Sequence, residues 1–233
     1  MHKIEIPEHV KDRVIQRQGK LHAVDALVPE KTALIVVDMQ NYFMEDGQMG
    51  CCPVARDIVP NVNRLAESLR EAGGQVVWIQ NAAPEETLRS WANLHELYSG
   101  ENRQTRLAGL EPGSEGYGLW KSLDVQPRDL RVEKTRYSAF IRGSSDIEQH
   151  LRDRDVDTLI VTGVATNVCC ESTARDAMML GFRTIMVSDA NAAPSDAEHN
   201  GTLANFLLFF GDVQSTEDIV NLMGPGMASV AAE

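Results

Sequence analysis

The sequence lacks several features that mark common functional classes. No apolar stretch reaches the roughly 18 to 20 residues that span a bilayer, and residues 1–20 are too charged for the core of a signal peptide. Basic side chains are in deficit, since 22 Lys and Arg against 34 Asp and Glu give a formal net charge of -12. This charge repels nucleic acids and anionic membranes. We therefore expect a cytoplasmic protein with a small-molecule partner, no nucleic-acid partner and no membrane partner.

Cysteine is also scarce. The four cysteines form two adjacent pairs, Cys51–Cys52 and Cys169–Cys170. This pattern matches neither a secreted disulfide framework nor a spaced zinc site. The pattern leaves open that one of these thiols has a chemical role.

From Thr32 onward, short β-branched runs alternate with longer amphipathic segments, a pattern typical of a parallel sheet with crossover helices. Several strands read as almost continuous apolar runs, as strands buried on both faces do. The sequence thus predicts an α/β fold, a three-layer sandwich with a mainly parallel sheet of about six strands and Rossmann-like topology. Strands are expected at residues 33–38, 75–80, 130–133, 158–163, 183–189 and 212–214, and helices at 55–72, 144–154, 167–180, 196–210 and 216–222.

One domain is expected over residues 29–224, preceded by a polar arm (1–28) and followed by a tail (225–233). Residues 82–119 interrupt the alternation with polar, glycine-bearing sequence. This segment predicts a long excursion over the sheet edge with a short helix near residues 85–98. Such excursions often carry substrate or subunit contacts.

Three reactive side chains follow predicted strands. Ligands of open parallel sheets bind beyond the carboxyl ends of the strands. Asp38 ends the first strand, Lys134 follows the third, and Cys169 and Cys170 open the helix after the fourth. Each also has a structural explanation, namely a turn-capping aspartate, a solvated lysine or a small buried thiol. The first turn of a helix favours thiolate, and Cys169 suits that position better than Cys170.

Three segments carry a specific resemblance: VVDMQNYF (36–43), EKTRYSAF (133–140) and VTGVATNVCCEST (161–173). In order and spacing they resemble the signature segments of isochorismatase-like cysteine hydrolases, and the resemblance extends over residues 32–222.

This resemblance implies a catalytic triad of Asp38, Lys134 and Cys169. It also implies a cis peptide between Val164 and Ala165, which would turn the N–H groups of Ala165 and Cys169 into an oxyanion hole. Asp38 would take the thiol proton as Cys169 attacks a carbonyl, while Lys134 holds the carboxylate. The chain is then expected to be a cysteine-dependent amidohydrolase that forms a thioester. Relatives commonly form dimers or tetramers, so a homo-oligomer is expected as well.

The same resemblance narrows the substrate. Nicotinamide-hydrolysing relatives bind a metal through histidines after the second strand, where this chain reads VWIQNAAP (77–84). We therefore predict no metal and no cofactor. Relatives that cleave vinyl ethers lack the cysteine, whereas members acting on ureidoacrylate, biuret or N-carbamoyl amino acids have similar segments. A small linear ureide or amide, hydrolysed with release of ammonia, is expected. Nicotinamidase-like or other small-carboxamide hydrolysis is the alternative.

Five residues are candidates for substrate contacts. The amides of Gln80 and Asn81 could pair with a ureido group or cap a turn. Tyr137 and Phe140 follow Lys134 closely enough to line its pocket. Arg136 could bind a substrate carboxylate or form a structural salt bridge.

Two non-enzymatic functions find less support. A nucleotide-binding module needs a glycine-rich turn after its first strand, and DMQNYF stands there instead. A thiol redox module is disfavoured because vicinal cysteines on a helix pair poorly and no C-x-x-C motif is present.

Overall fold

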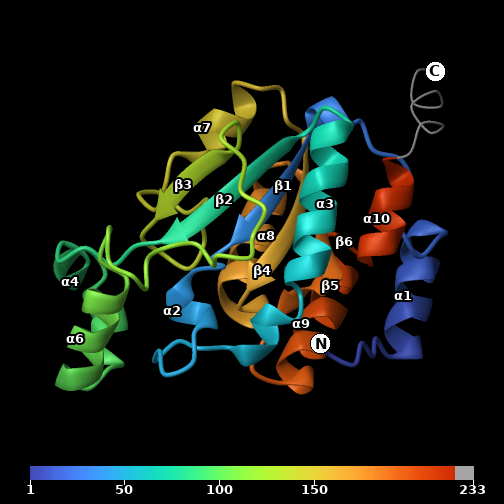
Figure 1. The fold of residues 1–233 in the computed structure, drawn as a ribbon. Coiled ribbons are helices and arrows are strands. Elements are labelled where there is room, and N and C mark those ends of the chain that lie inside the picture. Colours follow the sequence, from blue (N-terminus) through green and yellow to red (C-terminus); the bar gives the residue numbers. More distant parts are fainter. Residues whose placement is uncertain (224–233) are drawn as a thin grey trace.

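The computed structural model describes residues 1–223, which fold around a six-stranded sheet (Figure 1). All strand pairs are parallel, in the order β3-β2-β1-β4-β5-β6. The expected α/β class is confirmed, and the sheet is parallel throughout. The strands are β1 (Thr32–Val37), β2 (Gln75–Asn81), β3 (Leu130–Lys134), β4 (Thr158–Val164), β5 (Arg183–Ala192) and β6 (Asp212–Gln214). The strand order reverses between β1 and β4, where such sheets bind ligands.

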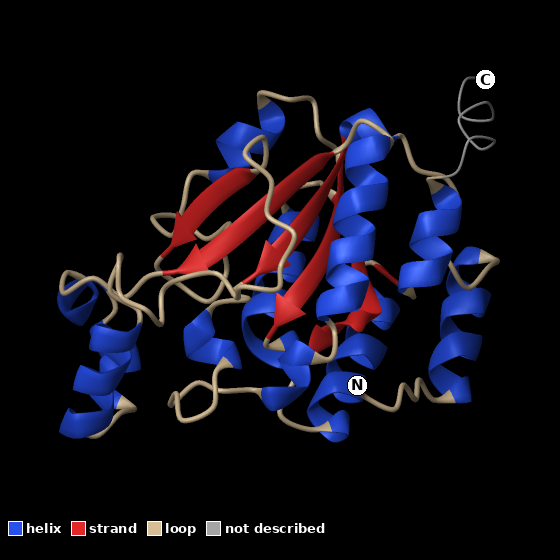
Figure 2. Cartoon of the chain, in the orientation of Figure 1, coloured by secondary structure: helices blue, strands red, loops and turns tan. Residues whose placement is uncertain are grey.

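Two apolar layers cover the sheet, because neighbouring residues of a strand point to opposite faces. In β1, Leu34 and Val36 pack under α3 (Val59–Glu71) and α10 (Thr216–Leu222). Ala33, Ile35 and Val37 pack on the opposite face with α7 (Ile147–Arg152), α8 (Glu171–Met179) and α9 (Asp196–Phe209). Figure 2 shows the resulting helix–sheet–helix layers, so the three-layer prediction is confirmed.

Several helix boundaries differ from the prediction, and the helix expected at 144–154 covers only Ile147–Arg152. Residues 53–56 form a 3₁₀ turn, so the regular helix expected from residue 55 begins only at Val59. In the excursion of residues 82–119, three short helices replace the single one expected. They are α4 (Thr87–Ser90), α5 (Ala92–Glu96) and α6 (Gly100–Gly109). They lie beyond the carboxyl ends of β2 and β3 (Figure 1).

The N-terminal arm contains a helix that the sequence analysis did not predict. In α1 (Glu8–Gln18), Val10 and Val14 are buried and belong to the same apolar cluster as α9. Upstream of α1, the His2 ring stacks on buried His199 with ring centroids 4.3 Å apart. The first residues are therefore packed against the domain. The predicted tail at 225–233 lies outside the described residues.

The buried His199 gives the fold a pH dependence. Its ring nitrogens contact Thr166 Oγ1 and the Ser188 carbonyl oxygen, each at 2.9 Å. Burial, assisted by the charge of His2, lowers the pKa of His199 to about 4, whereas an unfolded histidine titrates near pH 6.5. As the pH falls through this interval, protons bind the unfolded chain first. Stability is therefore lost between pH 6.5 and 4, by about 3 kcal/mol.

Urea unfolding at a series of pH values would measure this loss. A His199→Gln variant is expected to show a flatter curve over the interval, while substitution of the exposed His9 by Gln should leave it unchanged. Equal slopes for wild type and His199→Gln would contradict the assignment.

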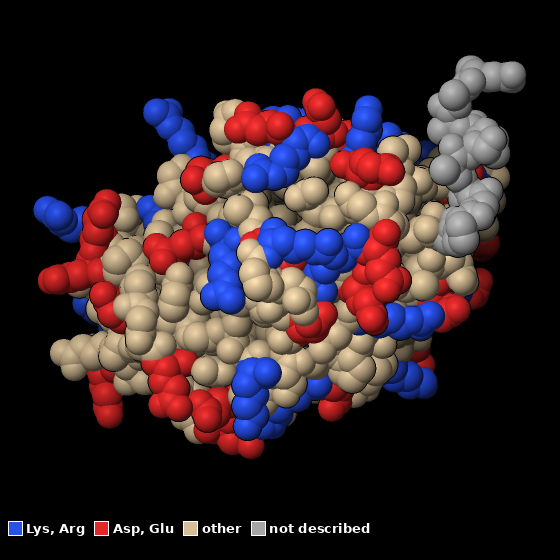
Figure 3. Space-filling model, turned by 45° about the horizontal axis from the view of Figure 1, so that its top comes forward, with Lys and Arg blue, Asp and Glu red and all other residues tan. Residues whose placement is uncertain are grey.

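Two surface properties bear on the expected partners. No helix among residues 1–223 is long and apolar enough to cross a membrane. On the face seen in Figure 3, basic and acidic side chains are interspersed, so that face carries no extended field of one sign.

Candidate active site

The site begins where β1 and β4 end side by side. Val37 pairs with Gly163, and a Cβ on Gly163 would lie 2.1 Å from the Val37 carbonyl oxygen. Gly163 also has φ of 117°, so this position requires glycine on both counts. The close approach lets the chain after β4 continue directly beside Asp38, which itself adopts φ of 53°.

Asp38 and Lys134 form an ion pair inside the protein. Lys134 ends β3, two strands from β1, and its Nζ reaches Asp38 Oδ2 at 2.8 Å. Neither side chain is exposed to solvent. Lys134 Nζ also donates to the carbonyl oxygen of Arg136 at 2.9 Å. The carboxylate and the ammonium therefore hold each other in one geometry.

Cys169 enters the site from the turn after β4. The Val164–Ala165 peptide is cis, and residues Thr166–Cys170 then form a π-helical turn before α8 begins at Glu171. The Cys170 N–H donates to the Ala165 carbonyl at 3.1 Å, closing this wide turn. The helix that was expected to be regular from residue 167 therefore starts as a π turn, a feature frequent at functional sites.

The two adjacent thiols lie in different surroundings. Cys169 is 4% exposed and lies beside Asp38 and Lys134, both of which shift its pKa. Cys170 is fully buried, and its thiol donates to the Thr162 carbonyl at 3.8 Å. Asp38, Lys134 and Cys169 are thus brought together, while Cys170 points into the core.

Burial dominates the electrostatics of the three groups. It raises the pKa of the Cys169 thiol, an effect that Lys134 opposes and Asp38 reinforces. Burial also raises the pKa of Asp38, against the lowering effect of Lys134. For Lys134, burial lowers the pKa, but Asp38 and Cys169 outweigh it and leave the pKa raised. The resting site therefore combines a protonated thiol with a carboxylate that is a stronger base than usual.

Asn81 Oδ1 is a buried acceptor with no hydrogen-bond donor among the described residues. An unpaired buried acceptor costs about 1 to 3 kcal/mol. The Asp38 carboxylate, by contrast, is contacted by Lys134, Cys169 and Asn81, all of which lower its pKa. Gln80 donates to the Tyr117 carbonyl at 2.9 Å. Of the two amides predicted to meet substrate, that of Asn81 has the free acceptor.

Gln40 is a supporting residue that the sequence analysis missed. Its side-chain amide is fully buried and bonds both backbone groups of Asn81, donating to the carbonyl at 3.1 Å and accepting from the N–H at 2.7 Å. It also donates to the Tyr117 carbonyl. In the sequence, the available signal for Gln40 was its position as a polar residue two places after Asp38, shortly before the aromatic pair Tyr42 and Phe43.

The residues after Lys134 take different roles. Arg136 donates to the carbonyls of Thr135 at 3.0 Å and Ser90 at 2.8 Å, and its guanidinium lies over the Trp91 ring. Tyr137 packs edge-on against Trp91, and burial together with nearby Tyr98 and Cys169 raises its pKa to about 12. The ring of Phe140 lies 5.6 Å from that of Phe182, in the core cluster. Tyr137 is therefore the one of the three placed beside Cys169.

A groove of about 540 Å³ opens next to Tyr137. It is lined by Trp91, Asn93, Arg136, Tyr137, Ser138, Ile141 and four residues of α8. A second groove, of about 390 Å³, lies between α3 and the loop before β3, at the other end of the sheet. Neither groove is lined by Asp38, Lys134 or Cys169, and the larger one reaches the site only through Tyr137. No group of three or more His, Cys, Asp or Glu residues within 1–223 is arranged to hold a metal ion.

Comparison with known proteins finds a family match and several similar solved structures. Residues 32–218 match the family model of the isochorismatase domain. A cysteine hydrolase from Pseudomonas syringae pv. phaseolicola 1448A is similar at 30% identity and a TM-score of 0.77, over 84% of this chain and 94% of that one. N-carbamoylsarcosine amidase from Thermoplasma acidophilum is similar at 25% identity and a TM-score of 0.63, over 80% and 97% of the two chains. An isochorismatase-like hydrolase from Alkaliphilus metalliredigens is similar at 26% identity and a TM-score of 0.68, over 83% of this chain and 99% of that one.

Proposed function

Because the chain belongs to the isochorismatase family of hydrolases, we propose that it is a cysteine amidohydrolase that cleaves a C–N bond of a small linear ureide or amide and releases ammonia. The observation that carries the proposal is the buried contact of Asp38 and Lys134, 2.8 Å apart, beside the Cys169 thiol. Nucleophile, base and cation stand together at the switch point of the sheet, where ligands of this architecture bind.

The reaction follows from these three side chains. Asp38 takes the thiol proton as Cys169 Sγ attacks the carbonyl, and the N–H groups of Ala165 and Cys169 stabilise the oxyanion. When the C–N bond breaks, protonated Asp38 returns its proton to the departing amine. Asp38 then deprotonates a water molecule, which hydrolyses the thioester, or the thiocarbamate formed from a ureide, and the thiol recovers its proton.

The raised pKa of Asp38 suits this role. A general base is most effective when its pKa lies near the working pH, which is above the usual range of a carboxylate. Burial raises the pKa of Asp38 and so makes its carboxylate a stronger base, while Lys134 opposes that rise and offsets the negative charge that develops on sulfur.

The free acceptor of Asn81 supports an amide or ureide substrate. Asn81 Oδ1 accepts no hydrogen bond from the described residues, and an N–H group of a ureido function would satisfy this acceptor. A nicotinamide ring offers fewer donors. Nicotinamidase-like or other small-carboxamide hydrolysis is the second candidate.

A substrate panel tests the proposal. We expect ammonia from biuret, triuret, ureidoacrylate or an N-carbamoyl amino acid, with kcat/KM for the preferred ureide above that for nicotinamide. The chain lacks the histidines through which metal-dependent relatives bind their ion, so EDTA should leave these rates unchanged. A clear preference for nicotinamide, or no ammonia from any ureide, would overturn the substrate assignment. Activity that returned on adding metal to chelated enzyme would refute metal independence.

We further propose that the enzyme works in the cytoplasm as a homo-oligomer, a dimer or tetramer. Exposed apolar side chains at the rim of the larger groove, Ile141 and Met179, support a subunit contact there. Light scattering that gave a monomer at micromolar concentration would contradict the assembly.

A further inference from the structure

Helix α6 is attached to the ends of the central strands. The Ala83 N–H, directly after β2, donates to the Leu110 carbonyl at 3.0 Å, and Leu110 is fully buried. The Tyr42 ring lies so close to Gly109 that a Cβ there would be 2.5 Å from it. Since Tyr42 follows Asp38 by four residues, α6 is held beside the strand end that carries the carboxylate.

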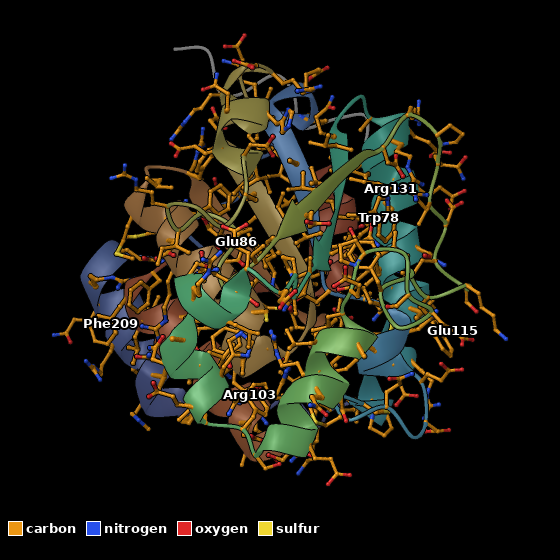
Figure 4. The ribbon with its side chains drawn as sticks, turned by 90° about the vertical axis from the view of Figure 1, so that its left-hand side faces the viewer. Trp78, Glu86, Arg103, Glu115, Arg131 and Phe209 are labelled. Carbon is orange, nitrogen blue, oxygen red and sulfur yellow. The ribbon has the colours of Figure 1, made fainter. Side chains whose placement is uncertain are left out.

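One face of α6 carries arginines toward the domain. Arg103, Arg106 and Leu110 are spaced by three and four residues, so they share the face that Leu110 buries. Figure 4 shows Arg103 between α6 and the helical turns that precede it. Arg106 is only 5% exposed. A helix on the edge of the protein therefore directs two guanidinium groups inward.

These guanidinium groups are unpaired. Arg106 Nη1 and Arg103 Nε are buried without a hydrogen-bond partner, and neither arginine forms an ion pair within residues 1–223. Arg70 gives the contrast, because it is similarly buried but bonded to Asp124 at 2.8 Å and Asp129 at 2.7 Å. A structural arginine of this protein thus has carboxylate partners. Leaving a buried charge unpaired is expensive, which indicates that α6 faces an anion supplied from outside.

The surroundings of Arg106 connect it to the nucleophile. Cys169 and Arg106 both shift the pKa of Tyr137, the first upward and the second downward. Arg106 also acts to lower the pKa of Tyr42. Buried His95 has a lowered pKa because of burial and then because of Arg106 and Arg103. The two tyrosines and the histidine near Arg106 are therefore neutral, and Tyr137 lies near both the Arg106 guanidinium and the Cys169 thiol.

We propose that Arg106, with Arg103 beside it, binds the carboxylate of an anionic substrate whose ureido or amide carbonyl is attacked by Cys169. The inference rests on the proposed function and narrows its substrate class to ureido or amido acids. The planar guanidinium fits a carboxylate through two parallel N–H donors. Arg136, already bonded to Ser90 and Thr135, has fewer donors left for this task.

Matched substrates test the carboxylate. With 3-ureidopropionate, Arg106→Gln should lower kcat/KM by about 30-fold or more. With propylurea, which has a methyl group in place of the carboxylate, the change should stay within about 3-fold. Arg106→Lys should retain part of the preference. Exposed Arg128→Gln, at the other end of β3, removes the same charge and should change neither rate. Equal losses on both substrates in folded Arg106→Gln would overturn the proposal.

An alkylation experiment separates this proposal from the amidohydrolase activity. The Cys169 thiolate displaces iodide from iodoacetate or iodoacetamide and forms an S–CH₂ bond, and mass spectrometry of the Cys169 peptide gives both rates. Iodoacetate carries a charged carboxylate where iodoacetamide carries a neutral carboxamide. Arg106→Gln should lower the iodoacetate-to-iodoacetamide rate ratio by about 10-fold or more relative to wild type and to Arg128→Gln. An unchanged ratio overturns the anion site, whatever the substrate panel shows. A lowered ratio supports it even if no ureide is hydrolysed.

Discussion

Replacing Cys169 with serine should lower kcat by at least about 10³-fold, because an alkoxide is far harder to generate than a thiolate beside the same carboxylate. Cys170→Ser should keep most of the activity. The Cys170 thiol is buried and donates to the Thr162 carbonyl, and a serine hydroxyl could donate to the same oxygen. We expect Cys170→Ser to cause a modest loss of stability, because it places a smaller, more polar group in the core.

Ammonia release and intact-mass detection of an acyl adduct would separate the two thiols. The adduct should form in wild type and in Cys170→Ser, and be missing in Cys169→Ser. An active Cys169→Ser alongside an inactive Cys170→Ser would show that the nucleophile is the other cysteine, one residue along.

Replacing Lys134 with methionine should destabilise the fold by about 3 to 5 kcal/mol and abolish turnover. Both members of the Asp38–Lys134 pair are fully buried, and removing one leaves an uncompensated charge in the interior. Without Lys134, the largest interaction that opposes the effect of burial on the pKa of Asp38 is lost. Protonation of Asp38 then relieves the unpaired charge, so the destabilisation should shrink as the pH falls below 7.

Denaturant unfolding of a double-mutant cycle would measure this effect. Asp38→Asn combined with Lys134→Met removes both charges and should recover much of the lost stability while remaining inactive. The exposed pair of Arg64 and Glu217, 2.7 Å apart, supplies the control, since Arg64→Gln should change stability little. A Lys134→Met variant as stable as wild type at pH 7 would contradict the buried ion pair.

The sequence determined the architecture because local signals and the fold agree. Continuous apolar runs such as residues 33–37 form strands covered on both faces, and the alternation with amphipathic segments leads to a parallel sheet. The strand-end rule also singled out Asp38, Lys134 and Cys169 as neighbours, since parallel strands end at one edge. The family resemblance depended on the same three segments.

Other features were decided only by the tertiary structure. α1 has only two buried apolar positions, and they become significant because α9 lies beneath them. The π turn at residues 166–170 depends on how β4 joins α8, which no local periodicity reveals. Gln40 and Arg106 look in sequence like ordinary polar residues of a turn and a surface helix. Their burial and their hydrogen-bonding state come from segments far away in the chain, so spacing alone could not identify Gln40 as a support of β2 or Arg106 as an unpaired charge near Tyr137.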